Sequence, residues 1–152
     1  MEKFIGNMDA KTDVKGRVFV PATFRKILQS AGETSLILRM DIYKDCLVLH
    51  PKFQWENKLD QLRENLDEFD EDAQNTFRQF AYLVETVELD ASGRILIPKK
   101  YLQSANITNE VRFLGMGDNI ELWNRSQLEK TIMSPEDFRA NVRKFLTKPK
   151  NG

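Results

Sequence analysis

Residues 13–21 read DVKGRVFVP, and residues 90–98 repeat the pattern as DASGRILIP. Aspartate, glycine, arginine and proline recur at the same offsets, and the residues between the arginine and the proline are apolar in both copies. The copies lie too far apart for a solenoid repeat, but their spacing suits two small units fused in tandem. The sequence therefore predicts two rounds of one structural unit.

Each copy predicts a tight turn that presents an arginine. The aspartate can accept hydrogen bonds from the backbone N–H groups that follow it, as in an Asx turn, and the glycine can supply a positive φ. The arginine then stands directly after a rigid turn. The turn-shaping residues are Asp13, Gly16, Asp90 and Gly93, and the arginines are Arg17 and Arg94.

A short strand and a helix are expected after the first turn. Residues 18–20 are all apolar, so we expect a strand that is covered on both faces, Phe19 included. Pro21 suits the first position of a helix over residues 21–30, where its missing N–H costs nothing, and Gly32 suits the position just past the helix end. The second copy is expected to repeat this helix.

The remaining pattern predicts a strand hairpin in each unit, two helices that join the units, and helices at the end of the chain. The last helix is expected to end near Leu146, and the residues from Pro149 onward are expected to be disordered. The hairpins pair residues 35–40 with 46–50 and 111–114 with 120–123, the joining helices run over 52–66 and from about 70, and the final helices follow the N-caps Asn124 and Ser134.

Composition excludes several classes of protein. The 152 residues, 41% hydrophobic and 30% charged, are typical of a soluble globular protein, and no membrane span or signal peptide is evident, so a cytoplasmic location is expected. The single cysteine, Cys46, lies in an apolar run that predicts a buried structural role. The single histidine, His50, leaves little from which to build a metal site or a catalytic pair. We expect no enzyme activity, no metal, no cofactor and no small-molecule substrate.

The charges are segregated along the chain although the net charge is zero. Residues 56–72 carry eight acidic and two basic side chains, and a basic segment from Arg139 to Lys150 closes the chain. A neutral total argues against a protein that coats nucleic acid through bulk charge, so local basic clusters matter more. These clusters are Lys11, Lys15, Arg17, Arg25 and Lys26 near the first motif and Arg94, Lys99 and Lys100 near the second.

Four further segments accompany the doubled motif: Phe4-x-Gly6, PATFR at 21–25, CLVLHP at 46–51 and ELW at 121–123. Together and in this order, they resemble the MraZ family of bacterial transcriptional regulators over nearly the whole chain. The resemblance implies an α+β fold in which two AbrB-like elements form a pseudo-two-fold swapped-hairpin β-barrel flanked by helices. The expected organisation is one domain over 1–152, with a first unit at 1–51, a helical insertion at 52–84, a second unit at 85–133 and a C-terminal helix and tail at 134–152.

The resemblance also implies a function. Family members are expected to form rings that bind short direct repeats in DNA upstream of the division and cell wall gene cluster, generally repressing it, at the nucleoid. Arg17 and Arg94 are then expected to reach the major groove and pair with guanine; alternatively, each closes an ion pair with the aspartate of its own turn. The expected phosphate contacts are Lys11, Lys15, Arg25, Lys99 and Lys100.

Other functions remain open from the sequence. The second motif continues as PKKY where the first continues as PATF, so the two copies need not contact DNA equally. The basic segment from Arg139 to Lys150 can contact either DNA or the acidic helix of a neighbouring subunit. An AbrB-type antitoxin and a structural ring without DNA binding are alternatives, and a hydrolase that uses carboxylates of residues 56–72 is a remote one.

Overall fold

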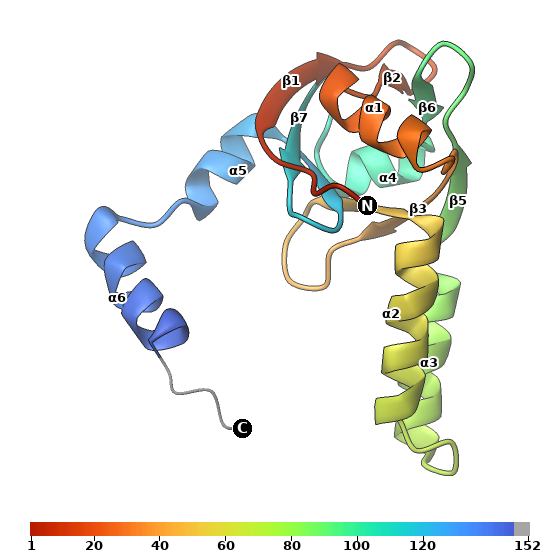
Figure 1. Cartoon of the computed structure of the whole chain (residues 1–152), viewed down its shortest axis with the longest axis vertical. Coiled ribbons are helices and arrows are strands. Elements are labelled where there is room, and N and C mark those ends of the chain that lie inside the picture. The colour runs from red at the N-terminus through yellow and green to blue at the C-terminus, as the bar shows by residue number, and fades with distance from the viewer. Residues whose placement is uncertain (148–152) are drawn as a thin grey trace.

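Two similar units follow one another along the chain in the computed structural model, which describes residues 1–147 (Figure 1). Each unit has a strand, a tight turn, a second short strand, a helix and a two-stranded hairpin. The first unit comprises β1 (Asn7–Lys11), β2 (Arg17–Phe19), α1 (Ala22–Ser30), β3 (Ser35–Met40) and β4 (Leu47–Pro51). The second comprises β5 (Glu85–Glu88), β6 (Arg94–Leu96), α4 (Lys99–Ser104), β7 (Glu110–Gly115) and β8 (Ile120–Trp123).

The two units exchange their first strands. An antiparallel six-stranded sheet has the order β1-β7-β8-β4-β3-β5, so the first strand of each unit pairs with the hairpin of the other unit. The strands β1, β3 and β4 of the first unit correspond to β5, β7 and β8 of the second. Exchanging each strand for its counterpart reverses the strand order of the sheet. The strand pairing is therefore swapped and has a pseudo-two-fold relation between its halves.

The second strands form a separate antiparallel ribbon of β2 and β6, with Val18 opposite Ile95. Hydrogen bonds from the Asp13 N–H to the Arg17 carbonyl and from the Asp90 N–H to the Arg94 carbonyl join each ribbon strand to the end of the preceding strand. Among the described residues, continuous strand pairing does not close sheet and ribbon into one cylinder, because β1 and β5 remain the sheet edges. The expected barrel is thus confirmed only in part.

The core lies between the sheet, the ribbon and helices α1 and α4. Phe4, Phe24 and Phe113 are fully buried there, and the rings of Phe4 and Phe24 meet edge to face with centroids 5.6 Å apart. Val18 and Ile95 fill the inner face of the ribbon. Because both units contribute to this one core, neither can bury its apolar face without the other.

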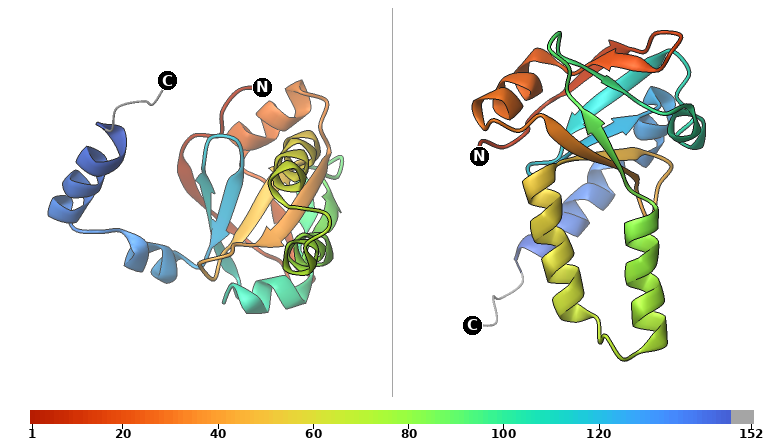
Figure 2. Two further views of the ribbon diagram at one scale, coloured as in Figure 1. Left: turned by 90° about the horizontal axis from the view of Figure 1, so that it is seen from below. Right: turned by 90° about the vertical axis from the view of Figure 1, so that its right-hand side faces the viewer.

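Two helices between the units project from the sheet as a long hairpin (Figures 1 and 2). They are α2 (Lys52–Asn65) and α3 (Glu71–Tyr82), close to the expected ranges. At the other end of the chain α5 (Arg125–Thr131) is followed by α6 (Pro135–Leu146), which lies away from the sheet (Figure 1). The helices of residues 1–147 include none that is both long and apolar enough to cross a membrane.

Several expected helix ends are confirmed in detail. The Gly32 N–H bonds the Gln29 carbonyl and the Glu33 N–H bonds the Leu28 carbonyl, which is the glycine-terminated C-cap that the sequence predicts. Ser134 caps α6 through its hydroxyl, which accepts from the Asp137 N–H. Asn124 caps α5 by accepting from the Gln127 N–H. The expected capping box there is only half formed, because the buried Gln127 Oε1 has no partner in the described chain.

Three details of the sequence-based prediction need correction or lie outside the structure. Pro21 is the N-cap of α1 and not its first residue, because its ψ of 139° is extended. Phe19 is 55% exposed, so the strand is covered on one face only: the ribbon packs its inner side on the core, and nothing within residues 1–147 covers its outer side. The disorder expected from Pro149 onward lies outside the described residues.

Candidate nucleic-acid interface

The first turn is built around the side chain of Asp13. Its Oδ1 accepts hydrogen bonds from the Lys15 N–H and the Arg17 N–H, each at 2.9 Å, while the Asp13 carbonyl accepts from the Gly16 N–H. Gly16 has a φ of +90°, and a Cβ there would stand 2.5 Å from the Ile97 carbonyl oxygen. The residue at this position must therefore be glycine, since both the conformation and the space exclude a side chain.

The second turn repeats this geometry. The Asp90 Oδ1 accepts from the Ser92 N–H, the Ser92 hydroxyl and the Arg94 N–H, and Gly93 has a φ of +89°. These bonds favour the ionised carboxylate: the Arg94 N–H, then Ser92 and the Arg94 guanidinium, lower the pKa of Asp90 to about 2. The backbone N–H of Arg17 lowers the pKa of Asp13 in the same way. Both turns are thus held by charged aspartates at neutral pH.

Each aspartate also holds the arginine that follows the turn. The Arg17 Nε donates to the Asp13 Oδ2 at 2.6 Å, and the Arg94 Nε donates to the Asp90 Oδ2 at 3.2 Å. The ion pair considered as the alternative to DNA contact is therefore present in both copies. Only Nε is used, and within residues 1–147 neither arginine has a hydrogen bond at its two Nη atoms. The ion pair with aspartate therefore leaves the Nη atoms of each arginine available for contact with another molecule.

The outer face of the ribbon carries the two arginines together with two exposed apolar side chains. Arg17 stands opposite Leu96, and Phe19 stands opposite Arg94, whose guanidinium carbon lies 5.8 Å from the centre of the Phe19 ring. Phe19 and Leu96 are 55% and 54% exposed. The sequence-based site omitted both. Strict alternation along a strand that is buried on one face, applied to both motifs, would have found them.

Arg25 lies against the turn of the other unit. A Cβ at Gly93 would stand 2.5 Å from the Arg25 Cδ and 2.7 Å from its Nη1, so this half-buried side chain passes directly over Gly93. The first turn has an apolar neighbour in the corresponding place, where the Leu102 Cδ1 would lie 3.4 Å from a Cβ at Gly16. The basic groups flanking the two turns therefore differ, which follows from different sequences after the two motifs.

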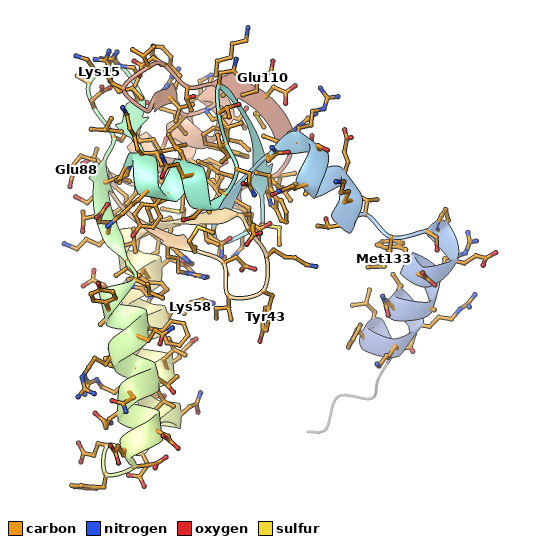
Figure 3. All side chains as sticks on the ribbon, turned by 180° about the vertical axis from the view of Figure 1, so that it is seen from behind. Lys15, Tyr43, Lys58, Glu88, Glu110 and Met133 are labelled. Carbon is orange, nitrogen blue, oxygen red and sulfur yellow. The ribbon has the colours of Figure 1, made fainter. Side chains whose placement is uncertain are left out.

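The predicted lysines have different surroundings. Lys15 is exposed at the tip of the first turn and lies at the end of the molecule opposite the α2–α3 hairpin (Figure 3). Lys11 ends β1 and stands opposite Glu110 in β7. Lys100 makes a 3.1 Å ion pair with Glu85, which raises the pKa of this lysine, whereas Lys99 is exposed at the start of α4. Lys100 therefore offers a partly neutralised charge.

The described residues offer little evidence for metal binding or catalysis. Among residues 1–147, no group of three or more histidine, cysteine, aspartate or glutamate side chains could hold a metal ion. Cys46 is fully buried, and burial raises the pKa of its thiol. His50 is also fully buried; its Nε2 accepts from the Arg39 Nε at 3.0 Å, and its Nδ1 pairs with the Gln54 Oε1. The acidic side chains of residues 56–72 are all exposed, without the burial that acid–base catalysis requires.

Comparison with known proteins yields a consistent group of relatives. The sequence model of a family described as "MraZ protein, putative antitoxin-like" matches residues 4–78 and 84–145. A protein of Bacteroides thetaiotaomicron named transcriptional regulator MraZ is 47% identical over 146 residues, which cover 96% of this chain and 94% of the relative. Proteins with the same name from Coxiella burnetii (34% over 126 residues; 83% and 82% covered) and Christiangramia forsetii (31% over 142 residues; 93% and 91% covered) are similar as well.

Proposed function

Since the chain belongs to the MraZ family, we propose that it is a transcriptional regulator that binds promoter DNA through the outer face of the β2–β6 ribbon. The observation that carries this proposal is the pair of arginines, each fixed at Nε by the aspartate of a rigid turn, with no hydrogen bond at its Nη atoms among the described residues. A side chain that is held in place before binding loses less conformational entropy on binding.

The shape of the ribbon supports this assignment. The major groove of B-form DNA, about 12 Å wide, admits a two-stranded β-ribbon, and several regulators read DNA in this way. Val18 and Ile95 anchor the inner face of the ribbon in the core, so its outer face is presented as a rigid surface. A ribbon of one arginine and one exposed apolar residue per strand can meet base edges without rearrangement.

The four outer side chains match the chemistry of base edges. The Nη atoms of Arg17 and Arg94 can donate two hydrogen bonds to guanine O6 and N7, and Phe19 and Leu96 can contact the methyl groups of thymine. Lys11, Lys15, Arg25, Lys99 and Lys100 flank these residues and are proposed to contact phosphates, which position the protein without reading sequence. Arg25 beside the second turn gives the two motifs unequal roles.

Further parts of the proposal concern the assembly and its target. Several copies joined in a ring would gain avidity on repeated sites, on the order of 10² to 10⁴, and this offsets a net charge of zero. The targets are direct repeats upstream of the division and cell wall genes, and the usual effect is repression, in the cytoplasm at the nucleoid. Sheet and ribbon together are proposed to form the swapped-hairpin barrel, with the ribbon bridging β1 and β5.

Fluorescence anisotropy with a labelled duplex from the region upstream of the protein's own gene cluster tests the proposal. The duplex is compared with a scrambled sequence of equal composition across a series of salt concentrations. We expect binding that prefers the promoter and weakens with salt, because phosphate contacts release counterions. Equal affinity for both duplexes would reject sequence-specific regulation, and no binding at low salt would favour the structural ring without DNA binding.

A further inference from the structure

The outer face of the β2–β6 ribbon is symmetric in its arginines but not in its apolar residues. Exchanging β2 for β6 about the centre of the ribbon places Arg17 on Arg94 and Phe19 on Leu96. The two arginines are chemically identical, whereas Phe19 has an aromatic ring and Leu96 does not. The two halves of the face therefore differ in whether a ring stands beside the arginine.

The Arg94 side chain is held at two places. Its Nε donates to the Asp90 Oδ2 at 3.2 Å, and its guanidinium carbon lies 5.8 Å from the centre of the Phe19 ring, directly opposite on the neighbouring strand. A cation within about 6 Å of a ring centre is attracted by the ring. Arg94 thus has a charged contact at one edge of its guanidinium group and an aromatic contact beside it.

The Arg17 side chain is held at one place only. Its Nε donates to the Asp13 Oδ2 at 2.6 Å, and the residue opposite is Leu96. Among the described residues no aromatic ring lies over the Arg17 guanidinium group, although five other cations of the chain have such a partner. The ion pair with Asp13 alone orients this arginine before DNA binds.

A hydrogen bond at one nitrogen fixes the position of a guanidinium group better than its plane, because the group can still turn about the axis of that bond. The plane matters for recognition of guanine, since both Nη atoms must reach O6 and N7 of the same base edge. An exposed ion pair is also a weak restraint by itself. A ring beside the group restricts the rotation that the ion pair permits.

We propose that Phe19 is a positioning residue, whose ring holds the plane of the Arg94 guanidinium group for pairing with guanine. Phe19 thereby determines the selectivity for the base pair that Arg94 contacts, and it does so from outside the Asp-x-x-x-Arg turns. The inference rests on the proposed function and deepens it.

The positioning contact joins the two units of the chain. Phe19 lies in β2 of the first unit and Arg94 in β6 of the second, and the register of the ribbon sets them opposite each other. The second arginine is therefore oriented by its own turn and by the other unit. Because a side chain that is oriented in advance loses less conformational entropy on binding, this contact favours the paired geometry with guanine over other contacts.

A double-mutant cycle on promoter preference tests the positioning. Preference is the ratio of the affinities for the promoter and the scrambled duplex in the anisotropy assay. Phe19→Leu removes the ring but keeps an apolar side chain, and it should lower the preference roughly 2- to 5-fold, the size of an exposed cation–π contact. In the Arg94→Ala background the same substitution should have no further effect, and in the Arg17→Ala background it should keep its full effect.

Two further variants separate the ring from general apolar contact. Phe19→Tyr keeps the ring and should retain more of the preference than Phe19→Leu. Leu96→Ala changes the matching residue of the same face and should lower the preference by the same factor with and without Arg94. An equal effect of Phe19→Leu in the Arg94→Ala background would show that the ring contacts DNA by itself, and no effect on the wild type would show that Arg94 needs no ring. Either result overturns the proposal, as would a Leu96 cycle that is equally non-additive.

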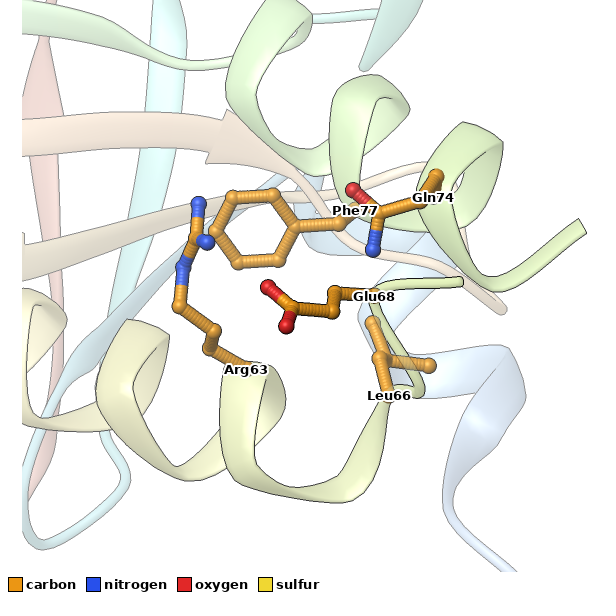
Figure 4. Close-up of a pocket in the computed structure, with 5 residues that line it drawn as sticks. All are labelled: Arg63, Leu66, Glu68, Gln74 and Phe77. Atoms are coloured by element: carbon orange, nitrogen blue, oxygen red, sulfur yellow. The ribbon is translucent and has the colours of Figure 1, made fainter. Parts of the chain in front are cut away.

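Side-chain NMR of the free protein with labelled arginine separates failure of this inference from failure of the proposed function. Phe19→Leu should shift the Nε–H signal of Arg94 and increase the motion of this side chain. Arg63 is the internal reference, because its guanidinium carbon lies 4.5 Å from the ring centre of Phe77 near the tip of the α2–α3 hairpin, beside a cavity that Figure 4 shows. Its signal should stay unchanged. An unchanged Arg94 signal overturns the positioning, whereas a changed signal without promoter preference in the wild type overturns the proposed function and the base reading with it.

Discussion

At the scale of single residues, Arg17 can contribute to DNA binding in two ways: through its positive charge and through the planar set of donors on its guanidinium group. The Asp13 carboxylate takes its Nε and leaves the two Nη atoms for a base edge. We expect Arg17→Ala to weaken promoter binding by about 1–3 kcal/mol, roughly 5- to 150-fold, and to reduce sequence preference. Arg17→Lys is the matched control, because lysine keeps the positive charge but lacks the planar pair of Nη donors. Anisotropy with promoter and scrambled duplexes measures both, and unchanged preference in Arg17→Ala would remove this residue from the site.

His50 gives a second prediction at this scale. Burial, with Arg39 and Lys58 nearby, lowers the pKa of His50 to about 4 from 6.5. The unfolded chain therefore binds a proton between about pH 6.5 and 4 that the folded chain does not, so stability is complete above this range and falls as the pH decreases through it. Between about pH 7.5 and pH 5, wild type should lose on the order of 2 kcal/mol more than His50→Gln in urea unfolding. Equal losses would mean that the buried imidazole titrates normally.

At the scale of elements, the two turns have the same backbone but different neighbours. An alanine at Gly16 or Gly93 would have to adopt a positive φ, and this strained backbone conformation costs about 1–2 kcal/mol. At Gly16 the added Cβ also meets the Ile97 carbonyl, which belongs to the backbone, whereas at Gly93 it meets the flexible Arg25 side chain. Gly16→Ala should therefore destabilise the protein more than Gly93→Ala in urea unfolding.

A third glycine supplies the control for this comparison. Gly32 has a φ of +68° and nothing within 4 Å of a Cβ, so Gly32→Ala measures the backbone strain alone. If Gly16→Ala costs no more than Gly32→Ala, the turn is not packed as tightly as described. Gly93→Ala should in addition displace Arg25 and weaken DNA binding, while Gly32→Ala should not.

At the scale of the whole molecule, basic and acidic groups lie at opposite ends. The ribbon with Lys15 lies at one end, and the acidic hairpin lies at the other (Figure 3), so a copy can approach DNA with its basic end while the acidic end stays away from the phosphates. The organisation as one domain, with units at 1–51 and 85–133, an insertion at 52–84 and a C-terminal part at 134–152, stays a prediction.

Assembly should decide the affinity for repeated sites. The wild-type protein should bind a duplex with several repeats on the order of 10²-fold more tightly than a duplex with one repeat, because linked modules act at high effective concentration. Anisotropy with the two duplexes measures the ratio of the two affinities, and equal affinity for both duplexes would show that avidity has no role.

Much of the fold follows from local sequence. Asp13 and Gly16 specify a turn through an Asx hydrogen-bond pattern and a positive φ, Gly32 ends α1, and Ser134 caps α6; each of these depends on residues that are close in the chain. The repeated motif likewise predicted two units, since a repeat is visible without any knowledge of contacts. The DNA contacts of Arg17 and Arg94 remain predictions.

What the sequence could not settle depends on groups that meet from different units. The register in which β1 pairs with β7 and β5 pairs with β3, and the place of Arg25 over Gly93, arise only when both units share one core. Local hydrogen bonds and dihedral preferences are encoded by neighbouring residues and so can be read from the sequence. Burial is set by which distant surfaces meet, and only the tertiary structure decides that.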